Sequence, residues 1–204
     1  MTENTPTVGF YFDPTCPFAW ITSRWILEVE KVRDVKVQFQ QMSLYMLNEG
    51  RDLDPDYRKH TDAGLVPGRA TMHVRETYGP EALADWYTAL GTRIHNEGDK
   101  DYPAVLRAAA DQLGHDADAI LAATESDALD AKLRQAQKEA EDLVGNDVGT
   151  PVVAFDGVAF FGPVLTRIPR GETAGEIFDA SLALARYPYF YEIKRARDTT
   201  PQFD

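Results

Sequence analysis

The order of apolar and polar positions at the N-terminal end of the chain predicts a strand, a helix and a second strand. Residues 8–12 form a short apolar run, as in a buried strand. Residues 16–32 carry an apolar face at helical spacing, made of Ile21, Trp25, Val29 and Val32. Apolar residues then alternate with polar ones at Val35, Val37 and Phe39, which is typical of a half-buried strand. A helix between two strands favours a crossover that places the strands parallel.

The middle of the chain has a different pattern, with apolar stripes at helical spacing separated by glycine or proline. A first helix opens at Pro80, with the stripe Leu83, Trp86, Tyr87, Leu90 and Ile94. A second runs from Pro103 toward Gly114. A third ends at Gly145, a residue type common just after a helix, and its stripe is Leu129, Leu133, Ala136, Ala140 and Leu143. We therefore expect an inserted helical subdomain over residues 44–145.

Strand patterns return after this middle part. Residues 152–155 and 158–161 are apolar runs joined by Asp156-Gly157, a strong signal for a β-hairpin. Thr173 and Glu176 have the spacing of a capping box, which predicts the start of a final helix. Without the middle part, the elements follow the order β-α-β and then β-β-α.

This order is that of the thioredoxin fold, so we expect an α/β protein with an inserted α-helical subdomain. The thioredoxin-like domain would consist of residues 1–43 and 146–194, and the insertion of residues 44–145. Residues 195–204 would form a C-terminal tail. We expect this tail to be solvated, because its few basic residues are followed by acidic ones.

Composition and charge narrow the classes of function. The 204 residues are 44% apolar and 26% charged, as in a soluble globular protein. The formal net charge of −12 argues against nucleic acid or an anionic membrane as a partner, since both require basic patches. The chain has neither a run of about 18 apolar residues nor the pattern of a secretory signal. With one cysteine and hence no internal disulfide, we expect a cytoplasmic protein.

The same survey predicts no metal and no tightly bound cofactor. The four histidines lack the spacing of metal ligands, and no glycine-rich phosphate loop precedes a helix.

Cys16, the single cysteine, lies between the predicted first strand and first helix. A thiol at a helix start is stabilised as thiolate by unpaired backbone N–H groups and the helix dipole. Pro17 suits the first helical position, which requires no backbone N–H, and Phe18 would offer an apolar surface beside the sulfur. The alternative is that Cys16 is a small buried apolar residue, as lone cysteines often are.

Thr150 and Pro151 support the first interpretation, because they stand directly before the strand at residues 152–155. In the thioredoxin order this proline falls where the fold carries a cis-proline facing the cysteine. The preceding residue would offer its backbone N–H and C=O to a partner. Outside this context, a proline opening a strand is tolerated in any sheet.

Ala19 stands where a dithiol site of the Cys-Pro-x-Cys type has its second cysteine. An alanine cannot attack a mixed disulfide, so any adduct on Cys16 must be released by an outside thiol. The residues thus predict monothiol chemistry.

Longer stretches of the chain resemble a known family, the actinobacterial cytosolic DsbA-like proteins typified by the mycothiol-dependent nitroreductase. The matching stretches are residues 20–29, 93–96, 147–151, 157–165, 167–172 and 201–204. The resemblance implies a thioredoxin fold with a helical insertion, mycothiol as the thiol co-substrate, and a capacity to form homodimers. It also implies that Asn48, Tyr57 and His95 line the substrate pocket. By themselves, Asn48 and Tyr57 are loop residues, and His95 is a histidine at a helix end whose charged form the dipole favours.

The chain departs from the family at the site itself. The nitroreductases of the family read Cys-Pro-Trp-Cys, whereas this chain has Cys16, Pro17, Phe18 and Ala19. We therefore expect a mycoredoxin-like monothiol oxidoreductase that exchanges with mycothiol mixed disulfides. A second hypothesis is a mycothiol-dependent reductase, transferase or isomerase of small electrophiles such as nitroaromatics, which activates a bound thiol. A third is a redox-inactive thioredoxin-like protein that binds partners.

Overall fold

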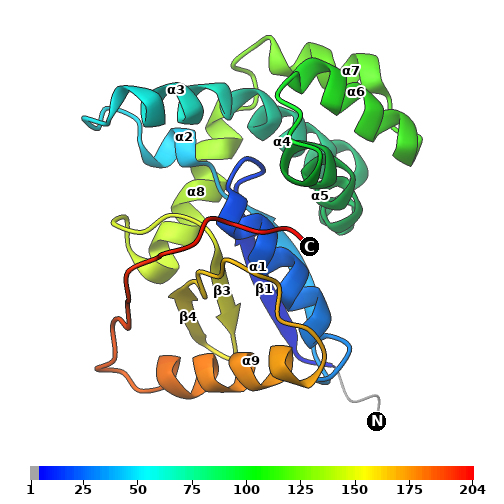
Figure 1. Cartoon of the computed structure of the whole chain (residues 1–204). Coiled ribbons are helices and arrows are strands. Elements are labelled where there is room, and N and C mark those ends of the chain that lie inside the picture. The colour runs from blue at the N-terminus through cyan, green and yellow to red at the C-terminus, as the bar shows by residue number, and fades with distance from the viewer. Residues whose placement is uncertain (1–4) are drawn as a thin grey trace.

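The computed structural model describes residues 5–204, and its centre is a four-stranded sheet (Figure 1). The sheet has the order β2-β1-β3-β4, and its strands are β1 (Thr7–Phe12), β2 (Lys36–Gln41), β3 (Val152–Phe155) and β4 (Val158–Phe161). β1 and β2 are parallel, β3 is antiparallel to β1, and β4 is antiparallel to β3. The predicted thioredoxin order, the parallel first pair and the hairpin at residues 156–157 are therefore confirmed.

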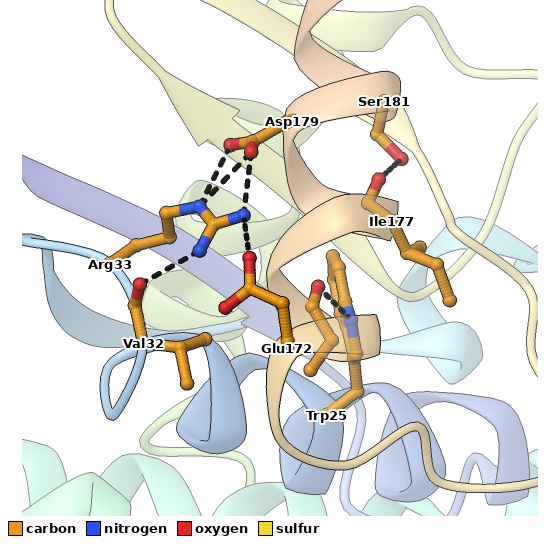
Figure 2. A network of polar contacts seen from close by, with 8 residues as sticks. Trp25, Val32, Arg33, Glu172, Ile177, Asp179 and Ser181 are labelled. Atoms are coloured by element: carbon orange, nitrogen blue, oxygen red, sulfur yellow. Dashed lines mark hydrogen bonds and ion pairs between the residues drawn. The ribbon is translucent and has the colours of Figure 1, made fainter.

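Helices α1 (Pro17–Val29) and α9 (Glu172–Ala185) pack against each other and cover one face of the sheet. The indole Nε1 of Trp25 donates a hydrogen bond of 3.0 Å to the backbone O of Ala174. Figure 2 shows a second link, in which the Arg33 guanidinium bridges Asp179 at 2.7 Å and Glu172 at 2.9 Å. These contacts hold α1, and with it Cys16 at its start, in a fixed position on the sheet.

Seven α-helices follow one another between β2 and β3. They are α2 (Leu44–Leu47), α3 (Pro55–Ala63), α4 (Leu65–Tyr78), α5 (Leu83–Gly91), α6 (Tyr102–Leu113), α7 (Ala117–Thr124) and α8 (Asp130–Val144). Residues of α4, α5, α6 and α7 form a hydrophobic cluster of their own, beside the one in the sheet. α8 returns to the sheet and contacts β2, β3 and β4 (Figure 1).

The structure differs from the predicted elements at two helices. The single helix expected from Pro80 is divided into a 3-10 turn (Pro80–Ala82), α5, and a π-helical turn (Thr92–Asn96). The capping box predicted at Thr173 is wrong, because α9 begins at Glu172 with Gly171 as its N-terminal neighbour. Gly171 has a φ of 58°, a conformation that favours glycine, and it turns the chain into the helix before Thr173 is reached.

Among residues 5–204, no helix is long and apolar enough to cross a membrane.

Candidate active site around Cys16

Cys16 is the residue that caps the N-terminus of α1. Its Sγ accepts a hydrogen bond from the backbone N–H of Ala19 at 3.4 Å. The same thiol donates to the backbone O of Thr150 at 3.6 Å, so both polar functions of the sulfur have partners. The side chain is only 6% exposed. The sulfur therefore lies in a nearly closed position between α1 and the start of β3.

Burial has the largest effect on the pKa of the Cys16 thiol. It raises the pKa of Cys16 above the ordinary value, and the nearby Asp13 carboxylate raises it further. The hydrogen bonds with Thr150 and Ala19 lower the pKa but do not offset the loss of hydration. In this conformation the start of the helix does not by itself lower the pKa of Cys16, because the effect of burial is larger. The favourable N–H group is present, but the sulfur is out of contact with water.

Thr150 and Pro151 face Cys16, as the thioredoxin order predicts. The peptide bond between them is cis, and the Thr150 backbone O points to the sulfur. Thr150 is buried at 5% exposure. If the thiol proton leaves when a partner binds, the Thr150 backbone O remains beside the sulfur as a hydrogen-bond acceptor for that partner.

His95 reaches the loop before Cys16 from the π-helical turn after α5. Its Nε2 is 3.0 Å from the backbone O of Pro14, and its ring stacks on Trp20 with the ring centroids 5.6 Å apart. Burial lowers the pKa of His95 to about 4. The expected stabilisation of its charged form by a helix end is therefore wrong, because desolvation outweighs the dipole and the imidazole is neutral at physiological pH.

Asn48 and Tyr57 lie on the other side of the site, on the first two helices after β2. Asn48 ends α2 and is buried, with its Nδ2 donating to the backbone O of Leu44 at 2.8 Å. Tyr57 lies on α3 and is 42% exposed. Burial raises the pKa of Tyr57, the charge of Cys16 raises it further, and a hydrogen bond with Asn48 lowers it. The Tyr57 side chain is therefore linked to Asn48 and is exposed enough to contact a ligand.

Phe18, the residue two positions after the cysteine, is half-buried. The guanidinium of Arg197 lies 4.6 Å from the centre of its ring, so a basic residue of the C-terminal segment stands over the site. Pro17 occupies the first position of α1, as expected from its missing N–H.

Asp13 is a further residue of the site, and its side chain does more than form the turn before Cys16. Its carboxylate is buried and accepts hydrogen bonds from the backbone N–H of Thr15 at 2.8 Å, the hydroxyl of Thr15 at 2.7 Å, and the backbone N–H of Leu44 at 2.8 Å. The available signal was an acidic residue three positions before a lone cysteine in a predicted core segment. Its long-range partner, Leu44, has no such signal.

Taken together, the sheet order and the cysteine opposite a cis-proline define a thioredoxin-fold protein of the DsbA-like class with a single thiol. Residues 15–195 match the Rv2466c-like family, described as the mycothiol-dependent nitroreductase Rv2466c. The chain belongs to this family of thiol-dependent redox enzymes.

Individual proteins are similar to this chain in sequence or in fold. An uncharacterized protein of Mycobacterium tuberculosis, Rv2286c, is 29% identical over 192 residues, covering 94% of this chain and 82% of that protein. The fold is similar to a probable DsbA oxidoreductase from Streptomyces coelicolor, with a TM-score of 0.58, 15% identity, and coverage of 95% of this chain and 94% of the other. It is also similar to a 2-hydroxychromene-2-carboxylate isomerase, with a TM-score of 0.57, 17% identity, and coverage of 88% and 95%.

Proposed function

We propose that this protein is a monothiol oxidoreductase in which Cys16 exchanges with mycothiol mixed disulfides. The observation that carries the proposal is the position of the Cys16 sulfur, held between the N–H of Ala19 and the backbone O of Thr150. A sulfur bonded to Cys16 would lie against that carbonyl, and the helix N-terminus would stabilise the charge on the cysteine when it leaves as thiolate. Family membership supports mycothiol as the thiol.

The exchange proceeds in two balanced steps. In the first, Cys16 loses its proton and its sulfur attacks the mycothiol sulfur of a mixed disulfide, which forms the Cys16–mycothiol bond and releases the substrate as a thiolate. In the second, the thiolate of another mycothiol attacks the mycothiol sulfur of that adduct. The products are oxidised mycothiol and the Cys16 thiolate, which takes up a proton again. Because residue 19 is alanine, no internal thiol competes with the second step.

Because the Cys16 thiol is buried at rest, loss of its proton is a separate requirement of the exchange. With its pKa raised by burial, Cys16 is a protonated thiol that donates to Thr150. Attack therefore requires loss of that proton as the disulfide enters, and the Ala19 N–H remains to stabilise the anion. Tyr57 and Asn48 on one side and His95 on the other would position the mycothiol moiety. The neutral His95 adds no positive charge to the site.

Mass spectrometry after incubation with oxidised mycothiol tests the proposal. We expect one mycothiol adduct on Cys16 that reduced mycothiol removes, and none on a Cys16→Ser variant. Because the wild-type chain has a single cysteine, the adduct needs no mapping. If no adduct forms on protein that is folded by circular dichroism, the exchange mechanism is wrong.

A second function is favoured by the burial of the thiol and by the isomerase-like fold. A nearly closed, protonated Cys16 is suited to donate a hydrogen bond to a bound mycothiol thiolate rather than to attack. The protein would then act on small electrophiles, as a reductase, transferase or isomerase. The variant Cys16→Ser discriminates, because serine retains a donor but cannot form a disulfide. Turnover of an electrophile such as a nitroaromatic by this variant with mycothiol would favour the second function, and its loss would favour exchange.

A further inference from the structure

The C-terminal segment, defined here as residues 197–203, returns to the protein surface instead of extending into solvent. In Figure 1 this last part of the chain crosses α1 and ends between α1 and α5. The backbone N–H of Gln202 donates to the backbone O of Thr166 at 2.9 Å, and the Thr199 hydroxyl donates to the Thr166 hydroxyl at 3.0 Å. The prediction of a solvated tail is therefore wrong for this segment, although its basic residue, Arg197, is exposed.

Phe203 connects the segment to residues that border the Cys16 loop. Its backbone O accepts a hydrogen bond of 2.9 Å from Asn96 Nδ2, and its ring centre is 5.7 Å from that of His95. Asn96 Oδ1 in turn accepts a hydrogen bond of 3.0 Å from the indole Nε1 of Trp20. His95 meets Pro14, two residues before the cysteine. A continuous series of contacts therefore connects the Cys16 loop to the docked segment.

A hollow of about 400 Å³ lies beside Asn96 and Phe203, at the end of this series of contacts. This volume lies within the range of small-molecule sites. The hollow is lined by Asn96, Gln202, Phe203 and Asp204. These residues offer two amides, a carboxylate and an aromatic ring, which together provide acceptors, donors and an apolar face. Hydroxyl groups on a saturated ring are matched by this combination, with hydrogen bonds to the hydroxyls and the C–H faces packed on phenylalanine.

We propose that this hollow is a subsite for the uncharged, hydroxyl-rich part of the thiol co-substrate, with Gln202 and Phe203 determining its specificity. The inference rests on the proposed function, in that a thiol reacts at Cys16. The hollow is connected to the Cys16 loop through two of its lining residues, since Asn96 contacts Trp20 and Phe203 contacts His95. A dicarboxylate thiol such as glutathione is disfavoured, because the lining includes Asp204 and no cation, and the chain carries a net charge of −12.

Calorimetric titration of the Cys16→Ser variant with reduced mycothiol tests the subsite without any exchange. Adding Gln202→Ala or Phe203→Ala should weaken mycothiol binding about tenfold, the effect of losing one well-placed polar or aromatic contact. N-acetylcysteine, which has the thiol but no sugar, should bind both variants as it binds their parent. Gln202→Ala keeps the backbone bond to Thr166, so the segment stays docked even if Phe203→Ala releases it.

Tyr191→Ala provides the matched control, since Tyr191 is 88% exposed in the same C-terminal region and should bind mycothiol as the parent does. Equal weakening for both thiols would show that the segment only supports the fold, and an unchanged affinity for mycothiol would show that the hollow is not used. Either result overturns the subsite. Because Cys16→Ser cannot exchange, these outcomes are independent of whether the wild-type protein forms an adduct.

Discussion

The carboxylate of Asp13 accepts a hydrogen bond of 2.8 Å from the backbone N–H of Leu44, the first residue of α2. This single bond joins the loop that carries Cys16 to the beginning of the helices between β2 and β3. The same carboxylate also holds Thr15 and lies close enough to Cys16 to raise the pKa of its thiol. Asp13 therefore couples the shape of the site to its protonation.

Replacing the Asp13 carboxylate with an amide tests its effect on the pKa of Cys16 and its effect on stability by two different measurements. Asp13→Asn removes a negative charge near Cys16, so we expect the pKa of the thiol to fall and alkylation by iodoacetamide at neutral pH to become faster. The amide cannot accept from both Thr15 and Leu44, so we also expect a loss of about 1–3 kcal/mol in the free energy of unfolding. Thr15→Val is the control, because it removes one hydrogen bond and keeps the charge. An alkylation profile of Asp13→Asn that matches wild type would contradict the electrostatic role.

Restoring a second thiol should change how an adduct is released. Ala19 lies one turn after Cys16, with its N–H on the Cys16 sulfur at 3.4 Å. In Ala19→Cys we expect the new thiolate to attack a mixed disulfide at Cys16 and release mycothiol without a second mycothiol. Mass spectrometry would show an internal disulfide, lighter than the reduced protein by two hydrogens. Ala19→Ser should retain the adduct until mycothiol is added, and a persistent adduct on Ala19→Cys would refute this geometry.

The packing of α5 against α1 depends on a glycine. A Cβ added to Gly91 would lie 2.3 Å from Cζ3 of Trp20, and this indole is held by Asn96 and stacked on His95. Because the ring has no free direction in which to move, we expect Gly91→Ala to lower the free energy of unfolding in urea by about 1–3 kcal/mol.

Gly68→Ala is a matched control for this helix glycine. The nearest atom to its added Cβ is Gln41 Nε2 at 4.0 Å, so the methyl group has room. Alanine is the better helix former, so we expect Gly68→Ala to be neutral or to stabilise the protein by about 0.5–1 kcal/mol. Equal losses for both variants would show that contact with Trp20 is not the cause.

His95 should make stability depend on pH below neutrality. Burial lowers its pKa to about 4, whereas an unfolded histidine titrates near 6.5. Between these values the unfolded chain binds more protons. The contribution of the neutral imidazole is therefore complete above about pH 6.5 and is lost as the pH falls toward 4, by about 3 kcal/mol in total.

Urea unfolding at about pH 7, 6 and 5, values that span the range where an unfolded histidine titrates, would measure this loss. His95→Gln retains a donor for the backbone O of Pro14 and should lose the part of the pH dependence that comes from His95. His73→Gln, at a partly exposed position on α4, is the control and should keep the wild-type dependence. Parallel curves for wild type and His95→Gln would show that His95 is not the titrating group.

The part of the site that could be predicted from sequence is the part with local signals. Cys16 and Pro17 stand at a boundary between two periodicities, and Thr150-Pro151 stands before an apolar run, so a fold order was enough to place them opposite each other. The docking of Phe203 on Asn96 and the bond from Leu44 to Asp13 join residues 107 and 31 positions apart. Neither changes the local pattern, and neither was predicted.

By itself, the sequence determined the strands, the helix after Cys16, the thioredoxin order and the absence of a second thiol, because periodicity and residue identity are local properties of the chain. Only the tertiary structure decided the protonation of the site. Cys16 has the helix position that favours a thiolate and His95 the helix end that favours a cation, yet both are shifted toward their neutral forms. Segments distant in sequence bury both groups. The free-energy cost of removing a charge from water is larger than the stabilisation that one helix end gives to that charge.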